Sequence, residues 1–114
     1  FISTLAGCGS KIPSDYPEET FPIYEDAYIK NATKNENGNF VVEGFSNDSV
    51  KEVADYYKDL IKNSDAEILS AKDNPDDFLV GGKLGGYMFT IIVTTAGDDS
   101  EYKTVFNIGL IPPI

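Results

Sequence analysis

Hydrophobic and polar residues alternate along several short segments of the chain, which is the pattern of half-buried β-strands. The alternation is clearest between residues 87 and 94, where every second residue is Tyr87, Phe89, Ile91 or Val93. The same reasoning predicts further strands over 27–33, 40–45, 66–71, 78–80 and 103–111. Asn37-Gly38 and Gly85-Gly86 accommodate positive φ angles, so they predict hairpin turns between neighbouring strands.

A different period marks the segment that ends near Asn63. Ser49 followed by Glu52 is the capping-box pattern that begins a helix. Hydrophobic residues then recur every three or four positions, as they do on one face of an α-helix: Val50, Val53, Ala54, Tyr57, Leu60 and Ile61. Because such a stripe on a single helix is ordinarily buried, we expect this face to pack on the sheet rather than to bind a partner.

The order of the predicted elements is strand, strand, helix and then three or four strands. Neighbouring parallel strands need a long crossover, usually a helix, and the pattern places none between the later strands. The sequence therefore predicts an α+β fold, with a mostly antiparallel sheet of five to six strands and one amphipathic helix packed on one face. Residues 21–114 are assigned to this single domain.

Composition excludes several classes of function. The chain has 19 acidic residues against 9 lysines and carries a net charge of −10, without arginine or histidine. Such a charge repels phosphate backbones and anionic headgroups, which argues against nucleic-acid binding and against electrostatic docking on membranes. The absence of histidine removes Ser-His and Cys-His catalysis. A pair of carboxylates is the catalytic alternative, but no spacing selects such a pair. We therefore expect no enzyme and no cofactor.

The only cysteine, Cys8, ends an apolar run at the start of the chain. Leu5-Ala6-Gly7-Cys8 combines a branched apolar residue, two small residues and a thiol. This motif resembles the lipobox of bacterial lipoprotein precursors. The resemblance implies a diacylglyceryl group on Cys8, with residues 1–7 as the remnant of a signal peptide. The alternative is a buried free cysteine at the end of a short strand.

The polar, proline-bearing residues after Cys8 predict a tether over 8–20. Lipobox, tether and small α+β domain together are similar to surface lipoproteins of Gram-positive bacteria. The similarity implies a lipid anchor in the membrane, an extracytoplasmic location and an envelope protein as a further partner. We expect a non-catalytic binding or interaction module. The alternatives are a structural or accessory envelope lipoprotein without a small-molecule ligand and, less favoured, a carboxylate-dependent hydrolase.

Tyrosines are the candidate binding residues, because tyrosine is enriched at interfaces and the chain has seven of them. Tyr57 and Tyr87 fall on predicted core faces, whereas Tyr16 is expected to be exposed in the tether. The remaining candidates for ligand binding are Tyr24, Tyr28, Tyr56 and Tyr102. A concave pocket lined by these tyrosines would favour a ligand, and a flat exposed sheet face would favour a protein partner.

Two further patterns are assigned to turns rather than to sites. The acidic segments 73–77 and 98–101 offer oxygen ligands for calcium, but they lack the spacing of an EF-hand loop. We therefore predict turns there and no metal site. The glycine-rich segment 80–86 lacks the order of residues in a phosphate-binding loop. It predicts a hairpin turn at Gly85-Gly86 and a bulge or close backbone approach at Gly81-Gly82.

Overall fold

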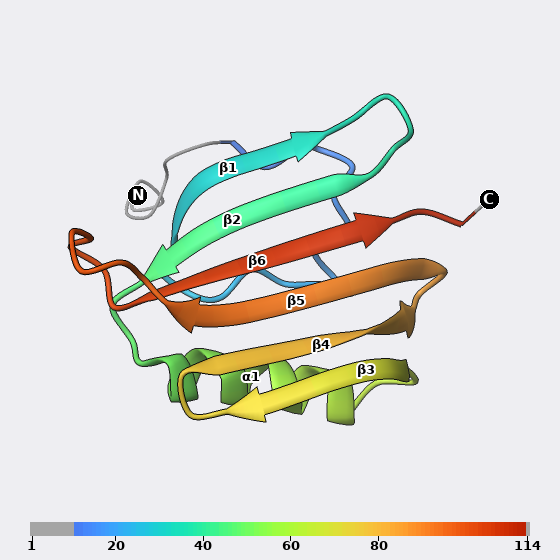
Figure 1. The fold of residues 1–114 in the computed structure, drawn as a ribbon. Coiled ribbons are helices and arrows are strands. Elements are labelled where there is room, and N and C mark those ends of the chain that lie inside the picture. The colour runs from blue at the N-terminus through green and yellow to red at the C-terminus, as the bar shows by residue number, and fades with distance from the viewer. Residues whose placement is uncertain (1–10, 114) are drawn as a thin grey trace.

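The computed structural model describes residues 11–113, and this part of the chain confirms the predicted α+β fold. It forms one antiparallel six-stranded sheet with a single helix packed on one face (Figure 1). The strands lie in the order β1-β2-β6-β5-β4-β3, so β1 and β3 are the two edges. The elements are β1 (Tyr28–Lys34), β2 (Phe40–Ser46), α1 (Val50–Lys62), β3 (Glu67–Asn74), β4 (Asp77–Leu84), β5 (Tyr87–Thr95) and β6 (Thr104–Ile111).

Both predicted glycine turns are confirmed by their backbone angles. The φ angle is +84° at Gly38, +62° at Gly85 and +87° at Gly86, in the region that side chains other than glycine disfavour. The turn between β3 and β4 is tighter than the turn predicted over 72–77. Asn74 already pairs with Asp77 across the hairpin, because main-chain pairing extends both strands to the tip.

The helix begins as its capping box predicts. The Glu52 N–H donates to Ser49 Oγ at 3.1 Å, and the Ser49 N–H donates to Glu52 Oε1 at 3.2 Å. Val53 and Tyr57 on its apolar stripe are fully buried, and the helix contacts β4, β5 and β6. The stripe is therefore part of the core, as predicted.

The segment before β1 covers the part of the sheet that α1 leaves bare. Tyr16 is only 6% exposed and Phe21 is completely buried. The Tyr16 ring packs edge-on against Phe40 with 5.5 Å between ring centroids, and its hydroxyl donates to the Phe21 carbonyl at 2.8 Å. The expectation that Tyr16 is exposed in a tether is therefore wrong. The apolar side of the sheet near β2 needs cover that a single helix on β4 to β6 cannot supply.

The predictions for residues 1–7 and for Cys8 lie outside the described residues. Within residues 11–113, no helix is long and apolar enough to cross a membrane.

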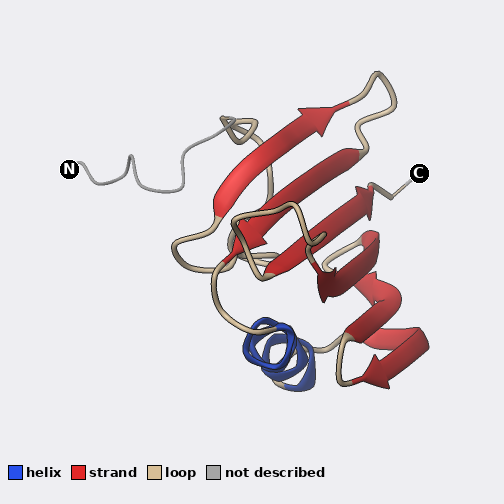
Figure 2. Ribbon diagram, turned by 60° about the vertical axis from the view of Figure 1, so that its left-hand side comes forward, coloured by secondary structure: helices blue, strands red, loops and turns tan. Residues whose placement is uncertain are grey.

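We call the described residues before β1, residues 11–27, the N-terminal segment. This segment and α1 lie on the same side of the sheet (Figure 2). Apart from the loop between β5 and β6, whose Tyr102 stacks on Phe45 at one end, no helix or loop of residues 11–113 covers the other side (Figure 1). We call that side the open face. Strand register places these outward residues on it: Tyr28, Val41, Glu43, Phe45, Asp77, Leu79, Gly81, Lys83, Met88, Thr90, Ile92, Thr94, Val105, Asn107, Gly109 and Ile111.

Candidate functional site

The four candidate tyrosines form two separate pairs rather than one pocket. Tyr24 and Tyr56 meet on the helix side with 5.3 Å between ring centroids and perpendicular rings. Tyr28 and Tyr102 stack at one end of the open face with 5.8 Å between centroids. Tyr57 packs in the core, as predicted. These residues therefore do not form the single tyrosine-lined pocket that would have favoured a small ligand.

Tyr24 and Tyr56 border a hollow of about 440 Å³ on the helix side, which we call the acidic hollow. The Tyr24 hydroxyl donates to Asp48 Oδ2 at 2.5 Å. Burial raises the pKa of the Tyr24 phenol, and the Asp48 carboxylate raises it further, so the phenol stays protonated and remains a hydrogen-bond donor at neutral pH. The other side chains that line the acidic hollow are carboxylates: Glu25, Asp26, Glu52, Asp55 and Asp59.

The acidic hollow is not arranged as a metal site. Among the described residues, no group of three or more histidine, cysteine, aspartate or glutamate side chains converges closely enough to hold a metal ion. Asp55 is instead paired with Lys51, at 2.7 Å between Oδ2 and Nζ. The carboxylates of the acidic hollow lie spread over a surface open to water, so they contribute negative charge but do not form a coordination sphere.

Tyr28 and Tyr102 belong to a larger group at one end of the open face. Phe45 stacks on Tyr102 with 5.5 Å between centroids, and the ammonium of Lys30 lies 5.9 Å from the centroid of the Phe45 ring. We call Tyr28, Phe45 and Tyr102 the aromatic cluster. It places two of the four predicted tyrosines on the open face, at the end of the sheet where β2 stops and the loop before β6 returns.

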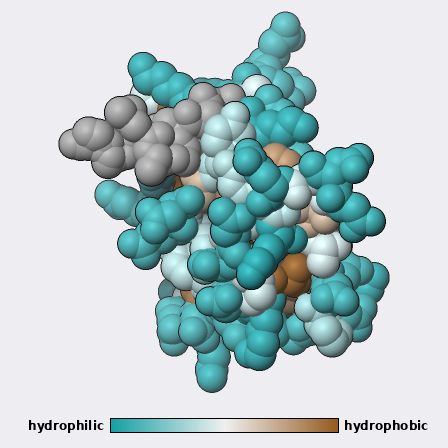
Figure 3. All heavy atoms as spheres, turned by 90° about the vertical axis from the view of Figure 1, so that its left-hand side faces the viewer, coloured by the Kyte–Doolittle hydropathy of each residue, from teal (hydrophilic) through white to brown (hydrophobic). Residues whose placement is uncertain are grey.

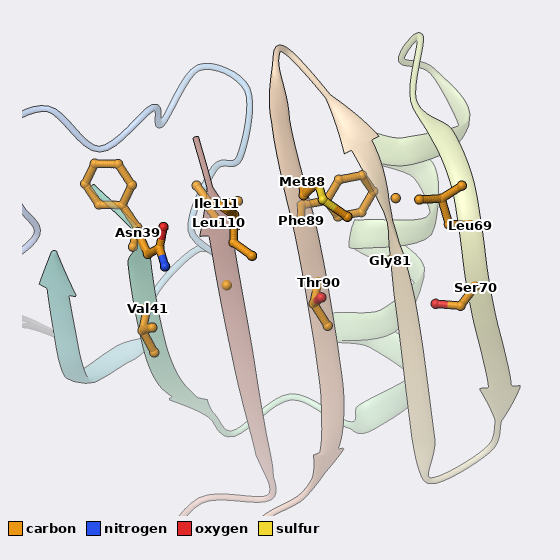
Figure 4. A pocket seen from close by; sticks show the side chains of 13 residues that line it. Asn39, Val41, Leu69, Ser70, Gly81, Met88, Phe89, Thr90, Leu110 and Ile111 are labelled. Atoms are coloured by element: carbon orange, nitrogen blue, oxygen red, sulfur yellow. The ribbon is translucent and has the colours of Figure 1, made fainter. Parts of the chain in front are cut away.

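The opposite end of the open face carries an apolar hollow of about 310 Å³ (Figure 4). Its floor is formed by Thr90 and the two glycines Gly81 and Gly109. Large apolar side chains stand around them with about half of their surface in water: Val41 at 51%, Met88 at 48%, Leu69 at 54% and Ile111 at 51%. Such exposure is ordinary for one side chain, but several around one hollow form a patch.

Strand register explains why the apolar hollow forms there. Gly109 pairs with Thr90, and Thr90 pairs with Gly81, so a row of small residues crosses three neighbouring strands. Met88 pairs with Ile111 in the adjacent row, and both project from the same face. The alternation over residues 87–94 could not reveal the hollow, because the row depends on which strands are neighbours. Hydrophobic residues at outward strand positions were the signal available.

The open face is also nearly neutral, in contrast to the chain as a whole. Register places Glu43, Glu67 and Asp77 on it together with Lys72 and Lys83, and Lys72 Nζ lies 2.6 Å from Asp77 Oδ2. By contrast, Figure 3 looks at the end of the molecule on the left of Figure 1, where hydrophilic residues cover most of the surface and apolar residues appear as small separate spots. On the open face, half-exposed apolar side chains instead gather around the apolar hollow.

The chemistry of the apolar hollow is that of contact rather than of reaction. The polar side chains lining it are Asn39, Ser70 and Thr90, and none of these exchanges a proton near neutral pH. Its shape and lining suit a hydrophobic side chain with a few hydrogen bonds at the margin. A comparison of this chain with protein-family models, with curated proteins and with solved structures found no match.

Proposed function

We propose that this protein is an extracytoplasmic lipoprotein, anchored through Cys8, that binds an envelope protein on the open face of its sheet without catalysis. The observation that carries the proposal is the patch of half-exposed apolar side chains around the apolar hollow. Monomeric proteins in water rarely expose large contiguous apolar patches, and such patches usually mark interaction sites.

A protein partner fits this face better than a small molecule does. The aromatic cluster lies at one end of the strands and the apolar hollow lies at the other end. Interface cores are enriched in tyrosine, phenylalanine and methionine, and a few anchors inserted into pockets carry most of the binding energy. A partner that spans both regions would place a hydrophobic side chain in the hollow and contact the aromatic cluster with a second segment.

Filling the apolar hollow is expected to weaken partner binding without unfolding the protein. A Cβ atom added at Gly109 would meet no heavy atom within 4 Å. Valine also suits a strand better than glycine, so Gly109→Val should leave the free energy of unfolding unchanged or raise it by up to about 1 kcal/mol. Its methyl groups would occupy the floor of the hollow, and we expect at least tenfold less partner capture. Urea denaturation measures the first effect.

Photocrosslinking in the native envelope measures the expected loss of partner capture. A photoreactive amino acid at position 88 should yield one discrete crosslinked product, which Gly109→Val should remove. The same amino acid at Lys62, an exposed residue at the end of α1, is the control and should yield no such product. Equal products at both positions, or a product insensitive to Gly109→Val, would contradict the proposal. A structural lipoprotein without a partner on this face would give no product at position 88.

Anchoring is tested separately by removing the thiol. Cys8→Ser should release the protein from the membrane fraction of its native host or leave it unprocessed, since the hydroxyl cannot form the thioether. Two or more acyl chains hold a protein stably on a bilayer, so the expected loss of membrane association is nearly complete. Ser10→Ala, which keeps the thiol, should fractionate like the wild type. Full membrane association of Cys8→Ser with a normal mature terminus would show that Cys8 is not the anchor.

A further inference from the structure

We infer that the β1 edge of the sheet faces the membrane surface, and that α1 and β3 are held away from it. The inference rests on the proposed lipid attachment at Cys8, and it adds an orientation that this attachment alone does not define. Two observations carry it: the length of chain between Cys8 and the first described residue, and the place where the described chain begins; the lysines of β1 add to them.

The linkage from Cys8 to the domain is short. Cys8 lies three positions before Lys11, and an extended chain covers at most about 11 Å over that distance. The residues that follow do not lengthen the linkage, because Ile12 packs against the core and Tyr16 and Phe21 are buried in it. A lipid on Cys8 therefore holds Lys11 within about 11 Å of the lipidated residue.

The described part of the chain begins beside β1. The first described residues run along β1 on the helix side of the sheet (Figure 1), and Asp15 forms an ion pair with Lys34 at the end of that strand. This ion pair lowers the pKa of the Asp15 carboxyl. The other edge of the sheet is β3, with α1 against β4, β5 and β6. The point of attachment is therefore at one edge of the sheet, and the helix lies toward the other.

The lysines of β1 favour the same orientation locally, although the net charge of −10 does not draw the protein to the membrane by itself. β1 contains Lys30 and Lys34 and has no acidic residue, and Lys34 is paired with Asp15. The acidic hollow beside α1 collects carboxylates from the helix and from the segments before β1 and before α1. Anionic headgroups attract lysines close to the surface and repel carboxylates. In this orientation the open face is perpendicular to the membrane plane, so a neighbouring envelope protein can contact it from the side.

The experiment uses the full chain and its single thiol. Cys8 is coupled to a maleimide-bearing lipid in vesicles of phosphatidylcholine and phosphatidylglycerol, which reproduces the linkage without the host's lipidation machinery. Hydrogen exchange of backbone amides is then compared with the uncoupled protein. We expect exchange to slow several-fold along β1, with β3 and α1 unchanged. Slower exchange along β3, or equal slowing at both edges, would overturn the inference. Failure of Cys8 to react would also overturn it, because the thiol must reach the bilayer.

Two variants sharpen the test. Cys8→Ser combined with Ala71→Cys moves the coupling point to β3, and the protection should move to β3 with it. Lys30→Glu keeps the short linkage at Cys8 but reverses a charge on β1, so protection there should fall. Unchanged protection in that variant would show that the lysines of β1 do not contribute to the orientation. Because the coupling is chemical, these outcomes are independent of whether Cys8→Ser changes membrane fractionation in the native host.

Discussion

Replacing Phe21 by alanine is expected to destabilise the domain by about 3–5 kcal/mol, the cost of deleting a fully buried aromatic ring. Phe21 is completely buried, and its ring lies 5.5 Å from that of Phe89 and 6.1 Å from that of Tyr87 between centroids. The deletion would leave a cavity between the N-terminal segment and β5. Urea denaturation followed by circular dichroism measures the loss of stability.

Val41→Ala is the control for this prediction, because Val41 is 51% exposed on the open face. It should cost no more than about 1 kcal/mol. A loss at Phe21 as small as that at Val41 would mean that the N-terminal segment is peripheral. The short linkage from Cys8 to the domain, and the orientation inferred from it, would then fail as well.

The N-terminal segment is also held by polar contacts at Tyr57, so Phe21 does not act alone. The Tyr24 N–H donates to the Tyr57 hydroxyl at 2.9 Å, and this hydroxyl donates to the Pro22 carbonyl at 3.1 Å. Burial raises the pKa of the Tyr57 phenol well above its usual value, which keeps it protonated as a donor. One helix residue thus satisfies two backbone groups of the segment that leads into β1.

Most of the fold could be predicted because its signals are local. Alternation in β5, the capping box of α1 and the glycines of the turns each depend on residues close together in the sequence. The burial of Tyr16 has a different origin. Its neighbours Pro13 and Pro17 are typical of a tether, and the ring is buried because one helix cannot cover a six-stranded sheet. No local pattern reports how much of a sheet face is left to cover.

The candidate site shows the same limit. Tyr28 and Tyr56 are each 37% exposed, so residue type gave their exposure correctly. It could not show that they lie on opposite sides of the sheet, nor that Gly109, Thr90 and Gly81 lie in one row. β6 lies between β2 and β5 in the sheet, and this pairing joins segments far apart in the chain. The apolar hollow follows from that pairing.

Gly82→Ala is the second substitution expected to have a large effect. A Cβ atom at Gly82 would lie 1.9 Å from the Glu67 carbonyl oxygen and 3.1 Å from the Ile68 Cα. The register of β3 shifts between Ile68 and Ser70 beside this glycine, which confirms the close backbone approach predicted for Gly81-Gly82. Backbone atoms cannot move aside as a flexible side chain can. We therefore expect a loss of about 3 kcal/mol or more in the free energy of unfolding.

Gly109→Ala is the matched control, because it is also a strand glycine but its added Cβ would meet nothing within 4 Å. Its free energy of unfolding should stay within about 0.5 kcal/mol of the wild type. In Gly82→Ala, hydrogen exchange should accelerate first along β3, since this edge strand is held by β4 alone among the described strands. Leu69 on β3 forms one wall of the apolar hollow, so crosslinking from position 88 should weaken too. Equal stability of the two alanine variants would mean that β3 can move away from Gly82 at little cost, and that the wall of the hollow is not rigidly placed.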